Sequence, residues 1–127
     1  MMTENEISAI IVDSAIEVHR TLGGPGPLES VYEEAMVCEL AKRNLSVKRQ
    51  FPVPIRYKDQ ILSSPLKIDL LVERRVIVEC KSTIEYNKVF ESQVLTYLRL
   101  TGLKLGIVVN FGERLVKDGI HCVVNYL

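Results

Sequence analysis

At 127 residues the chain is long enough to bury the core of one domain and too short for two, so residues 1–127 are expected to form a single domain. A hydrophobic content of 47% with 25% charged residues is typical of globular proteins and excludes a disordered chain. The 16 acidic residues balance the 16 basic ones, so the sequence lacks the overall positive charge that indicates nucleic-acid binding, although local basic clusters remain.

The amino-terminal segment shows no basic stretch followed by an apolar core, so no signal peptide is expected, and no apolar run approaches the length of a bilayer. The cysteines Cys38, Cys80 and Cys122 are widely spaced in apolar surroundings, and their odd number does not suggest a disulfide framework. We therefore expect buried, reduced thiols in a soluble, cytoplasmic protein.

The first predicted element is an amphipathic helix over residues 3–22. Thr3 and Glu6 form a capping-box pattern at its start, and Gly23–Gly24 ends it. His19 lies at the edge of the predicted buried face, where it is either a half-buried hydrogen-bonding residue or a ligand. The residues that recur at helical spacing are Ile7, Ile10, Ile11, Ala15, Val18 and Leu22.

Three glycines and two prolines in residues 23–27 predict a sharp turn between helices. The pattern of a phosphate-binding loop is absent, and no strand precedes the turn. A second helix is predicted over residues 28–43, with its apolar side formed by Leu28, Val31, Tyr32, Ala35, Met36 and Cys38.

Acidic residues are spread around this second helix. Glu29 lies at the margin of the apolar side, and its place in the first turn also suits the helix dipole. Glu33 and Glu34 are expected to be solvated, whereas Glu39 falls near the middle of the apolar side and is a candidate for a buried structural hydrogen bond or ion pair.

Residues 47–62 are predicted to form a strand pair that turns at residues 58–60. Pro52 and Pro54 cannot donate backbone hydrogen bonds and indicate an edge position.

The next stretch, residues 66–82, predicts a hairpin with charged residues in an otherwise apolar context. Ile68, Leu70 and Val72 are expected on one face of the first strand and Asp69 on the other. On the second strand Glu79 and Lys81 share a face. One interpretation is a cross-strand ion pair on a solvated face, and the other is a site for a hard divalent cation and an activated water. The strongly apolar second strand favours burial, where unpaired charge is costly.

A third helix is predicted over residues 87–101, closed by Gly102, with an apolar stripe of Val89, Phe90, Val94, Leu98 and Leu100. Gln93 and Tyr97 fall inside this stripe and point together toward the sheet. Strands at 105–110 and 121–126 complete a mixed α/β order with helices flanking a central sheet.

Taken together, these residues resemble the PD-(D/E)XK nuclease superfamily, and within it the group called GxxExxY proteins. The group's motif matches Gly26, Glu29 and Tyr32. The superfamily signature matches Asp69 and then Glu79-Cys80-Lys81. Gln93 and Tyr97 resemble the QxxxY helix motif of exonuclease domains in that superfamily, and the resemblance covers nearly the whole chain.

The resemblance implies a restriction-endonuclease-like αβββαβ core and a metal-dependent nuclease. Asp69 and Glu79 would bind Mg²⁺ or Mn²⁺, helped by the backbone carbonyl of Cys80, and Lys81 would orient or deprotonate the attacking water. Glu29 would complete the site. The resemblance also implies supporting roles. His19 would be an extra metal ligand, and Gln93, Tyr97 and Tyr32 would support the site or contact the phosphate backbone.

The expected substrate is nucleic acid, with DNA favoured over RNA, and a homodimer is one way in which so small a domain could build a groove. Two other interpretations stay open. One is a catalytically silent module that keeps the nuclease fold and binds or regulates. The other is a structural domain in which Asp69, Glu79 and Lys81 form an ion-paired cluster.

Overall fold

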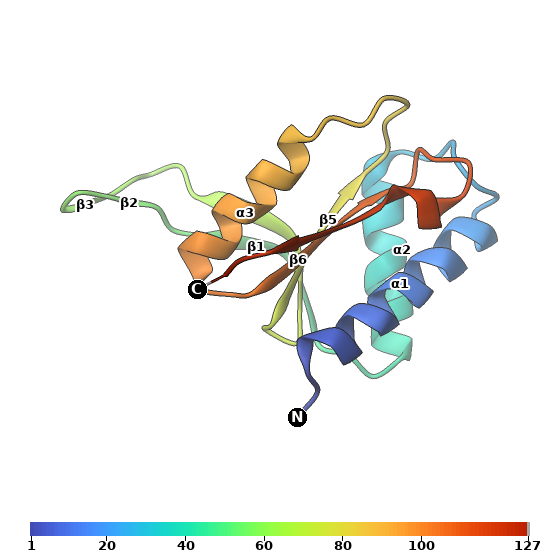
Figure 1. The fold of residues 1–127 in the computed structure, drawn as a ribbon, viewed down its shortest axis with the longest axis horizontal. Helices are drawn as coiled ribbons and strands as arrows, with labels where there is room; N and C mark the ends of the chain where they lie inside the picture. Colours follow the sequence, from blue (N-terminus) through green and yellow to red (C-terminus); the bar gives the residue numbers. More distant parts are fainter. Residues whose placement is uncertain (127) are drawn as a thin grey trace.

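The computed structural model describes residues 1–126. Within this range, helices pack on both sides of a central sheet (Figure 1). The elements are α1 (Glu4–Thr21), α2 (Glu29–Lys42), β1 (Val47–Val53), β2 (Arg56–Tyr57), β3 (Gln60–Ile61), β4 (Leu66–Val72), β5 (Val76–Lys81), α3 (Val89–Thr101), β6 (Leu105–Asn110), the 3₁₀ helix η1 (Val116–Gly119) and β7 (Ile120–Val124). Among the helices of residues 1–126, none combines the length and the apolar character that crossing a membrane requires.

The central sheet has the strand order β1-β4-β5-β6-β7 and is mixed. Neighbouring strands are antiparallel except β5 and β6, which are parallel and joined by the crossover through α3. β5 is the middle strand, and its first five residues are buried, as its apolar sequence predicts. Proline-containing β1 lies at one edge. The predicted mixed sheet with flanking helices is confirmed.

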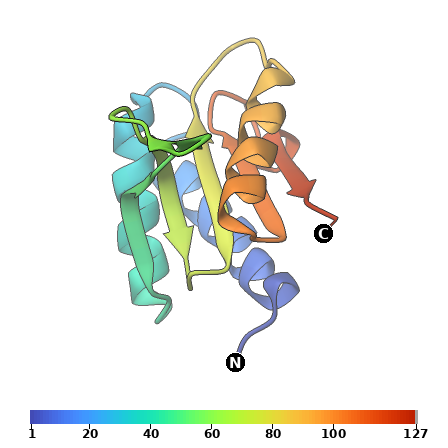
Figure 2. The same ribbon diagram turned by 90° about the vertical axis from the view of Figure 1, so that its left-hand side faces the viewer.

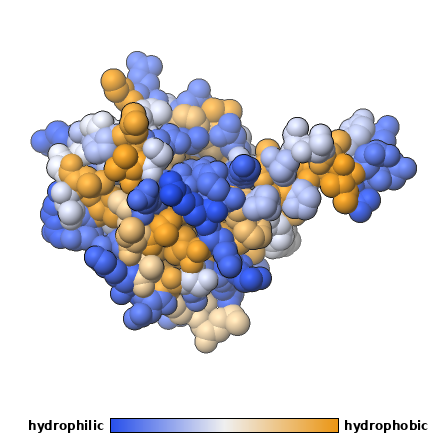
Figure 3. Space-filling view, turned by 180° about the vertical axis from the view of Figure 1, so that it is seen from behind, coloured by the Kyte–Doolittle hydropathy of each residue, from blue (hydrophilic) through white to orange (hydrophobic). Residues whose placement is uncertain are grey.

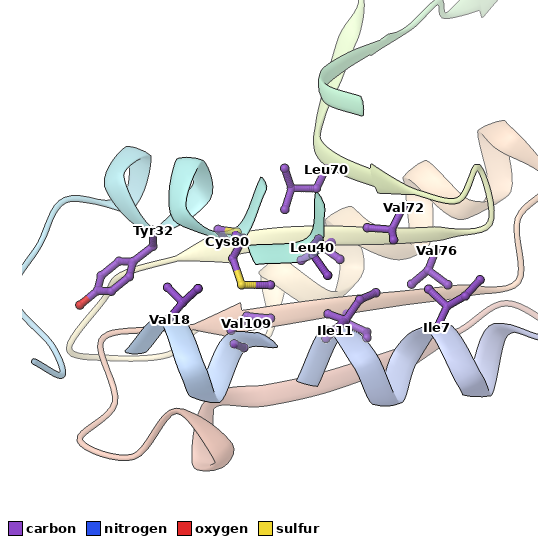
Figure 4. Close-up of a cluster of buried hydrophobic side chains, with 14 of the residues drawn as sticks. Ile7, Ile11, Val18, Tyr32, Leu40, Leu70, Val72, Val76, Cys80 and Val109 are labelled. Atoms are coloured by element: carbon purple, nitrogen blue, oxygen red, sulfur yellow. The ribbon is translucent and has the colours of Figure 1, made fainter. Parts of the chain in front are cut away.

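The helices form two layers, with α1 and α2 on one face of the sheet and α3 on the other (Figure 2). Figure 4 shows the larger of the two cores, in which side chains of α1 and α2 meet those of β4, β5 and β6. On the opposite face, α3 buries Val94 and Leu98 against Ile77 and Val108. The sheet is therefore covered on both faces near its centre.

The predicted ends of two helices are confirmed in atomic detail. The Thr3 hydroxyl accepts a hydrogen bond from the Glu6 backbone N–H at 3.2 Å, and the Glu6 carboxylate accepts one from the Thr3 backbone N–H at 3.2 Å. This is a complete capping box. Gly102 ends α3 with φ +74°, a left-handed conformation that favours glycine.

Several side chains predicted in the core are exposed, chiefly because α2 and α3 are rotated from the predicted faces. On α2 the stripe that reaches the core is Tyr32, Met36 and Leu40, at i, i+4 and i+8, so Leu28 and Val31 are exposed. Four other predicted core residues are also exposed: Leu22, Cys38, Val89 and Leu100. Cys122, on the edge strand β7, is also exposed, and Cys80 alone among the three cysteines is buried.

The strand pair predicted over residues 47–62 is also corrected. β1 pairs with β4 in the central sheet, and only β2 and β3 pair with each other, across a turn at Lys58 and Asp59. Residues 54–65, called the arm below, project from the body of the molecule on the side away from α1 and α2 (Figures 1 and 3). The arm joins the edge strand β1 to β4.

Candidate active site

The candidate site lies where the ladder between β4 and β5 ends. Backbone pairing runs from Val72 and Val76 to Leu70 and Val78, and stops there. Beyond that point side chains replace the ladder: the Asp69 N–H donates to Glu79 Oε1 at 3.1 Å, and the Cys80 N–H donates to Asp69 Oδ2 at 2.9 Å. These two bonds hold two carboxylates from neighbouring strands side by side.

This break in the ladder also corrects the predicted faces of β4. Leu70 packs into the core beneath α1 and α2, whereas Ile68 packs into the core beneath α3. In a regular strand residues 68 and 70 would share a face. The backbone therefore turns at Asp69, and that turn lets its carboxylate reach across to the Cys80 N–H.

Glu79 is the most perturbed of these acids. Glu79 is only 6% exposed. Burial, together with the charge of Asp69, raises the pKa of Glu79 from 4.5 to about 8. Oε1 accepts the Asp69 N–H. A cation placed between the two carboxylates would relieve the repulsion between them.

Lys81 and Glu29 extend the same cluster. Lys81 ends β5, and its Nζ lies 4.6 Å from the centroid of the Phe90 ring on α3, a cation–π contact that holds the ammonium group at this end of the sheet. Glu29 opens α2. Burial raises the pKa of the Glu29 carboxyl and the charge of Asp69 raises it further, while Lys81 acts in the opposite direction. The Glu29 and Glu79 carboxyl groups therefore each lie within the electrostatic influence of Lys81.

The two residues predicted on α3 differ in their placement. Tyr97 is half-buried in the core beneath α3, and the pKa of its phenol is raised first by burial and then by the charges of Glu79 and Asp69. Its phenol is thus near the carboxylates. Gln93, one turn earlier, is exposed rather than central in a buried stripe, because Val94 faces the core in its place.

His19 and Tyr32 have different neighbours. His19 is buried, with Nε2 3.0 Å from the Glu113 carbonyl oxygen, and its ring lies near those of Tyr32 and Phe111. Tyr32 stacks on Phe111 with ring centroids 4.4 Å apart and donates its hydroxyl to the Gly24 carbonyl at 2.5 Å. In Figure 4 this hydroxyl is directed away from the labelled core residues. These contacts fix the turn before α2, and none of them joins either residue to the carboxylates.

A cavity of about 520 Å³ lies beside His19 and is lined by Arg20, Arg114 and Lys117 among others. The carboxylates of the candidate site do not line it. The acids therefore occupy a different part of the surface from this cavity.

The sequence analysis missed a hydrogen-bond chain that supports Asp69. Glu33, predicted to be solvated, is only 6% exposed and accepts from Gln50 Nε2 at 2.7 Å and from Arg49 Nε at 3.2 Å. Gln50 Nε2 also lies within 3.3 Å of Asp69 Oδ1. Gln50 adopts φ +52° within β1, which is uncommon for a residue other than glycine. The available signal was the i, i+4 spacing of Glu33 and Glu29, which places both on one face of α2.

The donor set fits a hard divalent cation better than a soft one. Within residues 1–126, no group of three or more His, Cys, Asp or Glu residues could by itself hold a metal ion. Asp69 and Glu79 nevertheless supply two adjacent carboxylates, which is the number that Mg²⁺ commonly takes from a protein while it keeps bound waters. Burial raises the pKa of the Cys80 thiol well above its usual value, so this sulfur stays protonated and is a poor ligand.

Comparison with known protein families gives a match that covers most of the chain. The family model described as the PD-(D/E)XK nuclease superfamily matches residues 5–123. Neither a curated protein nor a solved structure gives a match to this chain. The matched range includes every residue of the carboxylate cluster.

Proposed function

Because the chain belongs to the PD-(D/E)XK nuclease superfamily, we propose that it hydrolyses phosphodiester bonds of nucleic acid with a divalent cation held by Asp69 and Glu79. Nucleases of this superfamily generally use divalent metals. We propose Mg²⁺ or Mn²⁺ as the ion, the Cys80 carbonyl as a further ligand, and DNA in preference to RNA as the substrate. When bound, such an ion lowers the pKa of a coordinated water and offsets negative charge on the phosphate.

The remaining chemistry falls to residues around the carboxylates. Lys81 has the charge to orient the attacking water and to stabilise the charge that develops on the phosphate. Its contact with Phe90 holds it at the end of β5 without neutralising it. Glu29, with its raised pKa and its position near Lys81, is suited to hold a proton at neutral pH more readily than an exposed glutamate. Tyr97 stays protonated and can donate to a phosphate oxygen.

The observation that carries this proposal is the pair of hydrogen bonds that brings the two carboxylates together: the Asp69 N–H donates to the Glu79 carboxylate, and the Cys80 N–H donates to the Asp69 carboxylate. A solvated cross-strand ion pair would place each acid against a base. Instead the structure brings two acids together, one of them buried with a pKa of about 8. Proteins rarely place like charges together in a buried position without a partner for them, and a cation is the simplest such partner.

The test is calorimetric titration of Mn²⁺ and Mg²⁺ at pH 8 into the wild type, Asp69→Asn, Glu79→Gln and Lys81→Ala. Glu34→Gln is the matched control, because this substitution also removes one negative charge, but from a side chain of α2 that is 72% exposed. We expect both carboxylate variants to lose at least tenfold in metal affinity, and Lys81→Ala and the control to keep it. Equal metal affinity in all variants would overturn the proposal and favour the structural cluster. Metal binding without cleavage of any DNA or RNA would favour the catalytically silent module.

A further inference from the structure

We propose that the arm (residues 54–65) is a binding site for single-stranded nucleic acid, with a base stacked on Tyr57 and phosphates held by Arg56 and Lys58. The inference rests on the proposed function for its class of ligand. It assigns a role to a part of the chain that lies outside the carboxylate cluster.

The arm exposes apolar and aromatic surface that its own fold does not cover. Tyr57 is 60% exposed, Ile61 is 64% exposed and Leu62 is 41% exposed. In Figure 3 hydrophobic surface is visible on the projecting arm. The ladder of the arm contains only the pairs Arg56–Ile61 and Tyr57–Gln60, and a two-stranded ribbon this short has little stability of its own in water. Large side chains on such a ribbon indicate a binding partner.

The charge around Tyr57 suits a phosphate backbone. Arg56 and Lys58 flank the tyrosine, and Lys67 follows at the base of the arm, whereas Asp59 is the acid among residues 54–67. Neither Arg56 nor Lys58 forms an ion pair with any residue in 1–126. The Lys58 ammonium lies 5.4 Å from the centroid of the Tyr57 ring. The Tyr57 ring therefore lies beside a cation that pairs with no acid, and single strands stack their bases on aromatic rings in such positively charged surroundings.

The position of the arm supports the same partner. The arm leaves β1 at Val53 and enters β4 at Leu66, and these two residues pair with each other. Asp69 follows only three residues later, about 10 Å along an extended strand. Because β4 and β5 are antiparallel, this end of β4 lies toward the end of β5 that carries Lys81. A single strand of nucleic acid that is bound at the carboxylates could therefore continue along the arm.

A second copy of the chain fits the arm less well. A stable dimer buries about 800 Å² on each partner. The three exposed side chains would supply less than this even if each offered about 200 Å². Arms that met across a twofold axis would also bring the cations at positions 56 and 58 toward their counterparts. The observed charge therefore favours an anionic partner.

The test measures binding of a short fluorescein-labelled oligothymidylate by fluorescence anisotropy, in EDTA so that no cleavage occurs. The variants are Tyr57→Ala, Tyr57→Phe and the double variant Arg56→Gln/Lys58→Gln. We expect Tyr57→Ala to weaken binding about tenfold or more, and Tyr57→Phe, which keeps the ring, to stay within about twofold of the wild type. The double variant should reduce the slope of log affinity against log salt by about 1.4, because each cation contributes about 0.7 on a single strand.

Three results would overturn the inference. They are unchanged affinity in Tyr57→Ala, failure of the wild type to bind the oligonucleotide, and a dimer in sedimentation velocity that Tyr57→Ala converts to monomer. Thermal unfolding of each variant confirms that it is folded. Failure of the proposed function can be told apart from failure of this inference. Loss of oligonucleotide binding in Tyr57→Ala together with an absence of metal-dependent cleavage would support the binding role of the arm and contradict the proposed nuclease activity.

Discussion

Replacing Glu79 by glutamine should make the metal-free protein more stable at pH 8 and change its stability little at pH 5. Burial and the charge of Asp69 raise the pKa of Glu79 from 4.5 to about 8 in the folded protein. Between these pH values the folded state holds a proton that the unfolded state has released. The free energy of unfolding of the wild type must therefore fall as pH rises from about 4.5 to 8.

The size of the effect follows from the pKa difference. At roughly 1.4 kcal/mol per pH unit, the wild type should lose on the order of 3 to 5 kcal/mol across this range through Glu79. Glutamine stays neutral, and its amide oxygen can still accept the Asp69 N–H that Glu79 Oε1 accepts at 3.1 Å. Glu79→Gln should therefore exceed the wild type by a few kcal/mol at pH 8.

The assay is urea unfolding in EDTA at pH 5, 6, 7 and 8, with the exposed Glu34→Gln as control. Wild type and control should weaken together as pH rises, and Glu79→Gln should weaken less. Saturating Mn²⁺ should restore the stability of the wild type at pH 8 and leave Glu79→Gln unchanged, because only a ligand that binds the folded state stabilises it. Parallel pH profiles for Glu79→Gln and the wild type would refute the reasoning.

Three further predictions concern the packing and the support of the site. Tyr32→Phe removes the hydroxyl that binds the Gly24 carbonyl and should cost about 1 kcal/mol in urea unfolding, whereas no loss would mean that the bond contributes nothing. Gly106→Ala places a methyl group against Val94 and should cost about 1–3 kcal/mol, with part of the loss recovered in a double variant that also carries Val94→Ala. Gln50→Ala should lower Mn²⁺ affinity about tenfold in calorimetry, since the amide supports a metal-binding carboxylate, and unchanged affinity would exclude that role.

The parts of the fold that are local in sequence could be predicted. The hairpin of β4 and β5, the capping box at Thr3 and the left-handed end of α3 at Gly102 each depend on residues within a few positions. The edge position of β1 followed from Pro52 and Pro54, because proline cannot donate in a central strand.

The support of the site depends on contacts that sequence spacing does not determine. Glu33 was expected in solvent, but its buried carboxylate accepts hydrogen bonds from Arg49 and Gln50, which lie 16 and 17 residues away in sequence. The backbone of β4 turns at Asp69, where hydrogen bonds to side chains replace the backbone pairing with β5. The assumption that side chains alternate regularly between the two faces of β4 therefore placed Ile68 on the wrong face.

The helix faces show the same limit. Gln93 and Val94 are adjacent in sequence, and the rotation of α3 that buries one and exposes the other is set by Ile77 and Val108 beneath it. Hydrophobic periodicity identifies the helix but fixes its rotation only to within about one residue.

The central claim is that this carboxylate pair and its lysine cut nucleic acid, and cleavage of labelled single- and double-stranded DNA and RNA tests it most directly. The wild type is compared with Lys81→Ala in Mg²⁺, in Mn²⁺ and in EDTA, and Lys42→Ala at the far end of α2 controls for the loss of one positive charge. The account predicts cutting in metal that is absent in EDTA, abolished by Lys81→Ala and kept by Lys42→Ala. Cutting that survives Lys81→Ala, or an absence of cutting of every polymer by the wild type, would contradict it.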